Sequence, residues 1–188
     1  MIRGLIRLGR ADPVSAETDA ERAIELARAA GDPQVVQTVL ARSVLIFISI
    51  GNRARAEETV DEAIAGLREV AQMGFAGVEA HTLAWAALTI GRDAEVIALL
   101  DREEFEPPWI QAGRAAAAGD FPLVADVLGG IGDVTSEALF RLRSVEQLVR
   151  EGRRAEADQQ LHRALAFYRS VGATRYIREG EALLAASA

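Results

Sequence analysis

Apolar residues recur along most of this chain at the spacing of an α-helix. Between residues 16 and 30 they lie three or four apart, at Ala20, Ala23, Ile24 and Ala27, which places them on one face of a helix. Ser15, just before this segment, is a candidate N-cap. Segment 33–50 is apolar on nearly all sides and is expected to be buried by several neighbours. Segment 53–70 has one apolar face and one face of Arg and Glu.

The same periodicity continues toward the C-terminal end, less regularly in the middle of the chain. Further helices are predicted over 75–90, 93–103, 108–118, 121–129, 134–151, 153–171 and about 174–186. No long segment alternates apolar and polar residues with a period of two, the pattern that a half-buried strand shows. The pattern therefore predicts an all-α protein.

A short turn built on glycine recurs between these helices, followed five positions later by a small apolar residue. The turn glycines are Gly51, Gly91, Gly119 and Gly152, separated by 40, 28 and 33 residues. A helical repeat of this length indicates an array of helical hairpins. No linker divides the chain, so we expect one helical-repeat domain over 1–188, with hairpins at about 15–50, 53–90, 93–118, 121–151 and 153–187.

The composition favours closely packed helices and argues against some classes of binding partner. Half of the residues are apolar but only 5% are aromatic, and much of the apolar share is alanine, the best helix former. The net charge of −7 argues against direct binding to nucleic acid or anionic membranes. The chain has no cysteine, and its apolar run at 44–48 is far shorter than the roughly 20 residues that span a bilayer. We expect a soluble, cytoplasmic protein.

The glycine turns resemble those of the tetratricopeptide repeat, in which a small residue, a larger residue and Ala follow the turn at fixed distances. The match is full at Gly51, Ala56, Val60 and Ala63, and again at Gly152, Ala157, Leu161 and Ala164. It is partial after Gly91, where Glu103 takes the Ala position, and after Gly119 it holds in size only. The resemblance implies a right-handed superhelix, or α-solenoid, of antiparallel hairpins.

The C-terminal tail carries a second resemblance. Residues 166–176, reading Ala-Phe-Tyr-Arg-Ser-Val-Gly-Ala-Thr-Arg-Tyr, and 181–185, reading Glu-Ala-Leu-Leu-Ala, are similar to the C-terminal part of large bacterial signalling ATPases, such as adenylate/guanylate-cyclase-associated regulators. In those proteins catalytic or DNA-binding parts and an ATPase precede a long helical array. The resemblance implies the C-terminal part of a larger signal-transduction or transcription regulator. Nothing in this chain matches the catalytic parts.

The residue patterns of common catalytic sites are absent from the sequence. All 21 basic residues are Arg, so there is no phosphate-binding loop of the Gly-Lys-Ser/Thr type. His81 and His162 lack the paired spacing of a metal-binding helix. The arginine pairs at 141/143 and 153/154 could clamp an anion, but Glu146, Glu151 and Glu156 nearby favour ion pairs within a helix. We expect no enzyme activity, no cofactor and no metal site.

A binding surface can instead be placed by geometry. In tetratricopeptide-like arrays the first helix of each hairpin lines the concave face. Counting back from the turn glycines puts seven candidate groove residues there: His81, Trp85, Thr89, Trp109, Leu142, Glu146 and Arg150. Aromatic anchors with polar neighbours are typical of binding hot spots; the competing interpretation is that both Trp side chains fill holes left by neighbouring Ala.

The favoured function is therefore a non-catalytic scaffold that binds a protein or peptide, or that packs against sister domains of a larger chain. The alternative is a small-ligand sensor with a pocket near Trp85 and Trp109. The chain begins with an apolar and Arg-containing segment where an array usually carries a polar cap. Self-association through this N-terminal face is a further expectation.

Overall fold

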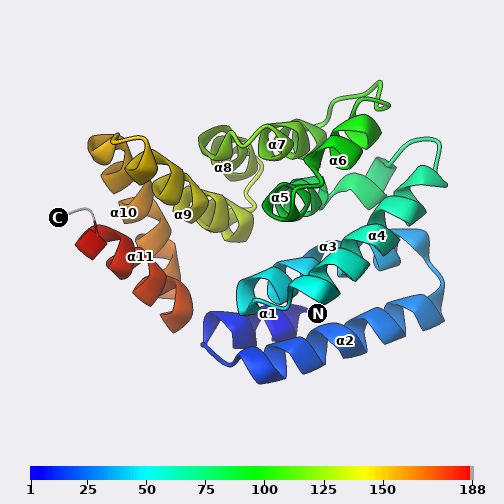
Figure 1. Ribbon diagram of the computed structural model, residues 1–188, viewed down its shortest axis with the longest axis horizontal. Helices are drawn as coiled ribbons and strands as arrows, with labels where there is room; N and C mark the ends of the chain where they lie inside the picture. The colour runs from blue at the N-terminus through cyan, green and yellow to red at the C-terminus, as the bar shows by residue number, and fades with distance from the viewer. Residues whose placement is uncertain (187–188) are drawn as a thin grey trace. The chain divides into compact units, whose positions relative to one another are not determined.

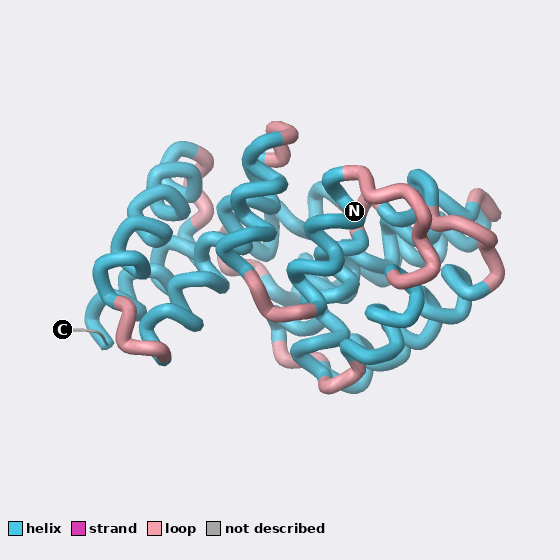
Figure 2. Tube along the Cα trace, turned by 90° about the horizontal axis from the view of Figure 1, so that it is seen from above, coloured by secondary structure: helices cyan, strands magenta, loops and turns pink. Residues whose placement is uncertain are grey.

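The chain is almost entirely helical. The computed structural model describes residues 1–186, with the side chains of all of these except 75, 76 and 184–186. Within this range it forms α-helices and one 3-10 helix joined by short loops, with no strand (Figure 2), which confirms the all-α prediction. The elements are α1 (Ile2–Gly9), α2 (Pro13–Ala30), α3 (Pro33–Ile50), α4 (Arg53–Arg68), η1 (Gly74–Gly77), α5 (Ala80–Ile90), α6 (Asp93–Leu100), α7 (Pro108–Ala117), α8 (Phe121–Gly130), α9 (Val134–Arg150), α10 (Arg154–Ser170) and α11 (Thr174–Ala186).

The helices divide into two compact units by their contacts. The first contains residues 1–8 and 12–119, and the second contains 9–11 and the helices from Asp120 onward (Figure 1). The boundary falls at the glycine turn after α7, where the sequence has no linker to mark it. The contacts thus divide the helices into two units, and the single helical-repeat domain over 1–188 stays a prediction.

The predicted glycine turns end their helices through left-handed backbone. Gly51, Gly91, Gly119 and Gly152 have φ between 74° and 81°, a conformation that glycine adopts without a Cβ penalty. At the end of α9 the N–H of Gly152 donates to the Val149 carbonyl (3.1 Å) and the N–H of Arg153 to the Leu148 carbonyl (2.9 Å). These bonds satisfy carbonyls that the helix itself leaves open.

Three helix starts differ from the sequence prediction. The N-cap of α2 is Asp12, not Ser15, because the Asp12 carboxylate accepts from the Ser15 N–H (3.2 Å) and Pro13 opens the helix. The helix predicted from residue 75 begins at Ala80, after the 3-10 turn η1. Residues 2–9 form α1, which is too short to show a clear period in the sequence.

In the first unit, α3 is surrounded by other helices. It packs against α2, α4 and α5, and α5 packs in turn against α6 and, most extensively, against α7. Two of the predicted hairpins pair α4 with α5 and α6 with α7. These helices are in contact, but α3 packs more closely against α4, and α5 packs more closely against α7. Among the helices described, α3 alone is long and apolar enough to cross a membrane. Its core positions Leu40, Val44, Ile46 and Phe47 are fully buried, as expected for segment 33–50. The buried core helix of a globular protein has the same apolar composition as a membrane span.

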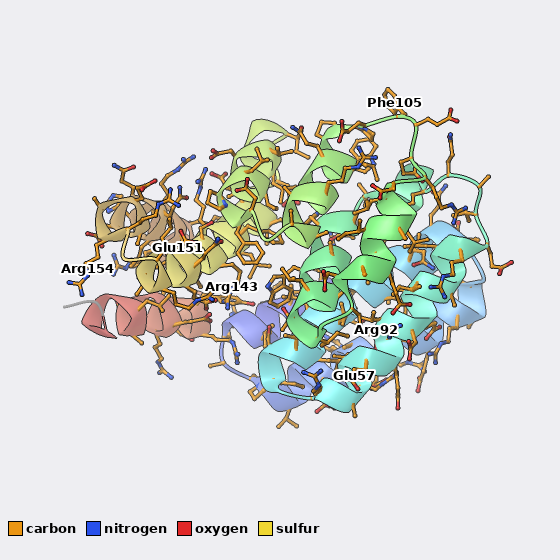
Figure 3. All side chains as sticks on the ribbon, turned by 45° about the horizontal axis from the view of Figure 1, so that its top comes forward. Glu57, Arg92, Phe105, Arg143, Glu151 and Arg154 are labelled. Carbon is orange, nitrogen blue, oxygen red and sulfur yellow. The ribbon has the colours of Figure 1, made fainter. Side chains whose placement is uncertain are left out.

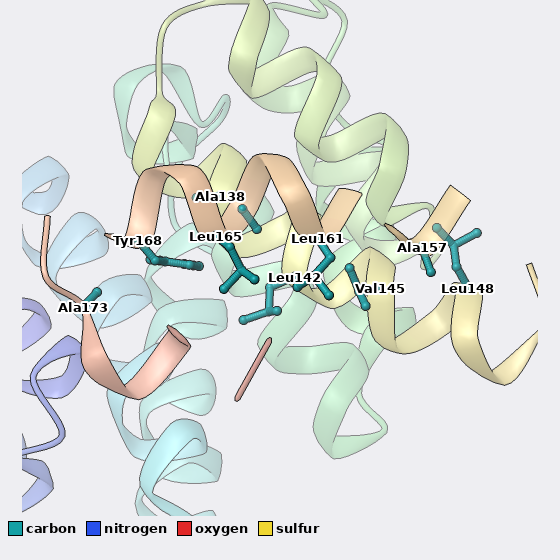
Figure 4. Close-up of a cluster of buried hydrophobic side chains, with 10 residues drawn as sticks. Ala138, Leu142, Val145, Leu148, Ala157, Leu161, Leu165, Tyr168 and Ala173 are labelled. Carbon is teal, nitrogen blue, oxygen red and sulfur yellow. The ribbon is translucent and has the colours of Figure 1, made fainter. Parts of the chain in front are cut away.

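In the second unit, α9 packs against α8 and α10, and α11 packs against α10 and α9. Its core is a cluster contributed mainly by α9 and α10 (Figure 4), consisting of Ala138, Leu142, Val145, Leu148, Ala157, Leu161, Ala164, Leu165, Tyr168 and Ala173. Ala157 and Ala164, two of the small residues of the repeat pattern, lie in this cluster. Small side chains at these positions allow α9 and α10 to approach closely.

Candidate functional site

The candidate site lies on α9, on the side of the helix next to its core face. Leu142, Val145 and Leu148 point into the core of the second unit. Successive residues of a helix are rotated by about 100°, so Arg143, Glu146 and Gln147 share a neighbouring face. That face meets α11, which packs against α9, and Arg143 lies between the two helices (Figure 3).

The guanidinium of Arg143 is shared by two carboxylates from different helices. Nη1 donates to Oε1 of Glu146 on α9 (2.7 Å), and Nη2 donates to Oε1 of Glu179 on α11. The exposed fractions of the three side chains are 16% for Arg143, 33% for Glu146 and 27% for Glu179. The guanidinium is therefore largely shielded from water, whereas the two carboxylates remain partly exposed. We call these residues, with Gln147, the α9/α11 cluster.

Two stacked tyrosines adjoin the cluster. The rings of Tyr168 on α10 and Tyr176 on α11 have centroids 4.7 Å apart and planes inclined by 21°. Burial raises the pKa of Tyr168 well above its ordinary value and that of Tyr176 to about 12, while the nearby charge of Arg143 acts in the opposite direction. Both phenols therefore stay neutral at physiological pH, so the charge of the site resides on Arg143 and the two carboxylates.

The cluster is short of positive charge. Burial raises the pKa of Glu146, and the charge of Glu179 raises it further, although Arg143 acts in the opposite direction. One guanidinium thus faces two carboxylates whose mutual repulsion it only partly offsets. With both carboxylates ionised, the three hydrogen-bonded groups carry a net charge of −1, which the nearby exposed guanidinium of Arg150 offsets in part.

Two polar atoms of the cluster are also without hydrogen-bond partners. Nε of Arg143, a donor, and Oε1 of Gln147, an acceptor, are both buried, and neither has a hydrogen-bond partner among the side chains and backbone that the structure describes. The amide nitrogen of Gln147 is engaged, since Nε2 donates to Glu151 (2.9 Å). Buried polar groups are satisfied in most proteins. A ligand that supplies both an acceptor and a donor would reach these buried atoms only after the two side chains turn outward.

The candidate groove residues of the first unit lie in different surroundings. His81 and Trp85 on α5 are buried, and Nε2 of His81 lies 3.9 Å from Oε2 of buried Glu79. Thr89 is exposed, but its hydroxyl donates to the Trp85 carbonyl (2.8 Å) within the same helix. Trp109 on α7 is half-buried. Of these four residues, Thr89 and Trp109 alone present appreciable surface.

In the second unit, Glu146 belongs to the α9/α11 cluster, whereas Leu142 and Arg150 do not. Leu142 is fully buried in the core, which corrects its placement on an open groove: the residue on the adjacent face is Arg143, one position later. Arg150 is exposed, and its Nε donates to the Glu146 carbonyl (3.2 Å). Sequence reasoning missed Arg143, Gln147 and Glu179 as site residues. The predicted ion pairs within helices are confirmed for Arg143 with Glu146 and for Arg153 with Glu156.

Glu79 forms a second, buried polar group in the first unit. Its Oε1 accepts from Nε of Arg42 on α3 (2.7 Å), and Oε2 accepts from the Thr82 hydroxyl (3.3 Å). These bonds join the start of α5 to α3. The adjoining cavity, bordered by Gln37 and Glu79, has a volume of about 10 Å³, near the lower limit for one water molecule.

No family model, curated protein or solved structure matches the chain. Within residues 1–186, side chains of His, Asp and Glu do not gather in threes at a geometry that could hold a metal ion. The functional proposal therefore rests on the chemistry of the α9/α11 cluster.

Proposed function

We propose that this chain is a non-catalytic helical scaffold that binds a protein or peptide, and that the α9/α11 cluster receives a cationic side chain of that partner. The observation that carries the proposal is the guanidinium of Arg143 shared between Glu146 and Glu179. An incoming Lys or Arg side chain would add the missing positive charge. Hydrogen bonds between charged groups are the stronger kind.

The unpaired atoms favour a peptide over a free amine. An extended peptide carries a carbonyl and an N–H beside every side chain. Once the side chains of Arg143 and Gln147 turn outward, its carbonyl would accept from Nε of Arg143 and its N–H would donate to Oε1 of Gln147, both of which are buried without partners in the described residues. Filling both removes a desolvation cost of about 1–3 kcal/mol for the neutral Gln147 amide and more for the charged Arg143 guanidinium. Tyr176, which unlike the buried Tyr168 keeps some exposed surface, supplies a neutral aromatic border for the aliphatic part of the side chain.

The packing of the helices supports a scaffold of the tetratricopeptide-like kind. Glycine turns join α3 to α4 and α9 to α10, and next-but-one helices also touch: α3 with α5, α5 with α7, and α9 with α11. Stacked hairpins produce this combination of contacts. With the tail resemblance of residues 166–185, it supports a regulatory module from the C-terminal part of a larger signalling or transcription regulator.

The small-ligand sensor is a second proposal, supported by the position of the two tryptophans. Trp85 and Trp109 lie on α5 and α7, the most closely packed helix pair of the first unit. A ligand that separates these helices would change the environment of both indoles. A saturable change in tryptophan fluorescence during a metabolite screen would support this alternative, and an unchanged spectrum would contradict it.

The peptide proposal can be tested with a randomised nine-residue peptide library displayed against the full chain. We expect the selected peptides to share an Arg or Lys at one position. Fluorescence anisotropy with a selected peptide should show binding weakened about tenfold or more by Arg→Gln in the peptide, or by Glu179→Gln in the protein.

A matched control comes from α10. Glu156→Gln changes the net charge equally, but Glu156 pairs with Arg153 on the exposed surface, away from the cluster. Peptide affinity should stay within about twofold of the parent, since a distant exposed charge contributes little to binding. Selection without a basic residue, or equal loss in the Glu179→Gln and Glu156→Gln variants, would contradict the proposal. Circular dichroism establishes that each variant is folded.

A further inference from the structure

The loop between α6 and α7 presents an aromatic side chain to solvent. Phe105 is 74% exposed and projects from the edge of the first unit (Figure 3). Its exposed neighbours include Asp101, Glu104 and Glu106. An exposed large apolar side chain within an acidic segment suits a partner surface that is both apolar and basic.

This loop is held in place by hydrogen bonds at both ends. Arg102 donates to the Val70 carbonyl (2.8 Å), and the Met73 N–H donates to Oε1 of Glu103 (2.9 Å). From α7, Arg114 donates to the Leu100 carbonyl through Nη2 (2.8 Å) and to Oε1 of Glu106 through Nη1 (2.9 Å). Because the loop is already ordered, docking through Phe105 loses less conformational entropy than docking through a free loop.

The same unit carries a surface of the opposite kind on α1. Ile2 and Ile6, one turn apart, are 66% and 50% exposed, whereas Leu8 is fully buried. Arg3 and Arg7 flank these residues and bind Asp19 of α2, and the Arg3 side chain is still largely exposed. Residues 1–11 contain three Arg and no acidic residue. We call Ile2, Arg3 and Ile6 the α1 face.

The two surfaces cannot meet within one molecule. In Figure 1 and Figure 3, α1 and the α6–α7 loop lie on opposite sides of the first unit. We infer that the Phe105 loop of one copy docks on the α1 face of a second copy, with Phe105 against Ile2 and Ile6, and Glu104 facing Arg3. The contact is head-to-tail, so each bound pair leaves one loop and one α1 face open for further association.

Sedimentation velocity of the full chain tests this inference. Between about 10 µM and about 1 mM, a range suited to weak association, the weight-average sedimentation coefficient should rise beyond that of a dimer. High salt should reduce the rise, because exposed charges are screened. Phe105→Ala and Ile6→Ser should each leave a monomer. Val171→Ser, which changes an exposed apolar residue of the second unit, should associate like the parent.

Mixing the two monomeric variants tests the head-to-tail contact most directly. The Phe105→Ala variant retains its α1 face and the Ile6→Ser variant retains its loop, so an equimolar mixture should form dimers and no larger species. A parent chain that stays monomeric over the whole range would overturn the inference. So would association that survives in both variants, or a mixture that stays monomeric. Circular dichroism spectra matching the parent exclude misfolding of the variants.

Discussion

Arg143 on α9 donates a hydrogen bond to Glu179 on α11, 36 residues later in the chain. This contact joins two helices that are separated in sequence by the whole of α10. It also places the Glu179 carboxylate beside Glu146, where a single guanidinium serves both. The relationship is the basis of the proposal that the cluster receives a cationic side chain.

The titration of Glu146 follows from this arrangement. Burial and the charge of Glu179 raise its pKa above the ordinary value of 4.5. The folded chain then binds more protons than the unfolded chain at pH values between 4.5 and the raised pKa, so this group lowers stability as pH rises through that window. At pH values above the raised pKa of Glu146, this loss of stability is complete.

Urea unfolding of the parent and Glu146→Gln should therefore diverge with pH. The free energy of unfolding of the parent, relative to the variant, should fall as pH rises from about 4.5 toward neutrality. A side-chain NMR titration of Glu146 should give a midpoint above 4.5. A midpoint below that value would contradict the described environment.

The crossing of α5 and α7 depends on a glycine. A Cβ added to Gly113 would lie 2.9 Å from Cβ of Ala80 and 3.2 Å from Cδ2 of Leu100. The short Ala80 side chain cannot move aside, so Gly113→Ala should separate the helices. We expect the free energy of unfolding to fall by about 1–3 kcal/mol, despite the better helix propensity of Ala.

Gly130 near the end of α8 provides the matched control, because a Cβ there meets no atom within 4 Å. Gly130→Ala should leave stability unchanged or raise it by up to about 1 kcal/mol. Thermal unfolding followed by circular dichroism compares the two variants. Equal effects would show that helix propensity, not helix contact, determines the result.

Asp19 attaches α1 to α2. Its buried carboxylate accepts from Nε of Arg3 (2.8 Å) and pairs with Nη1 of Arg7 (3.1 Å). Asp19→Asn removes the charge that both guanidinium groups face, so amides of α1 should exchange with deuterium about tenfold faster or more. In the control Glu25→Gln, which alters an exposed pair on the same helix, exchange in α1 should match the parent.

The left-handed backbone of the glycine turns predicts an order of stability among substitutions at Gly152. Gly152 has φ of 75°, and no atom lies within 4 Å of an added Cβ, so a substitution changes only the backbone preference. Asn tolerates this conformation better than other residues with a side chain, and β-branched residues tolerate it least. Chemical unfolding should rank Gly above Asn, Asn above Ala by roughly 1 kcal/mol or less, and Val lowest. An Ala variant as stable as the parent would contradict the strained turn.

Local patterns were sufficient to predict most of the fold. The apolar period placed segment 33–50 within the core, and positive φ at Gly51 and Gly152 follows from the need to end one helix and begin another in a tight turn. The division at residue 120 could not be predicted, because it depends on which helices pack and not on any composition shift. The start of α5 was predicted too early because residues 74–77 are apolar but form a 3-10 turn.

The site was predictable only in part. Glu146, predicted as a groove residue, lies in the α9/α11 cluster, whereas Leu142 is buried in the core, since a shift of one residue rotates a helix position by about 100°. Glu179 could not be predicted from the sequence at all. Its contact with Arg143 depends on how α11 packs against α9, which no pattern within either helix specifies.

Side-chain NMR of Arg143 tests the central claim most directly. The Nε–Hε signal of Arg143, assigned by its loss in Arg143→Lys, reports the donor that now lacks a partner. Titration with a selected Arg-containing peptide should shift this signal saturably, together with the Gln147 side-chain amide, and leave Arg22 on α2 unchanged. If the signal does not move at saturating peptide, or moves equally with the Arg→Gln peptide, the cluster is not the site of a cationic side chain.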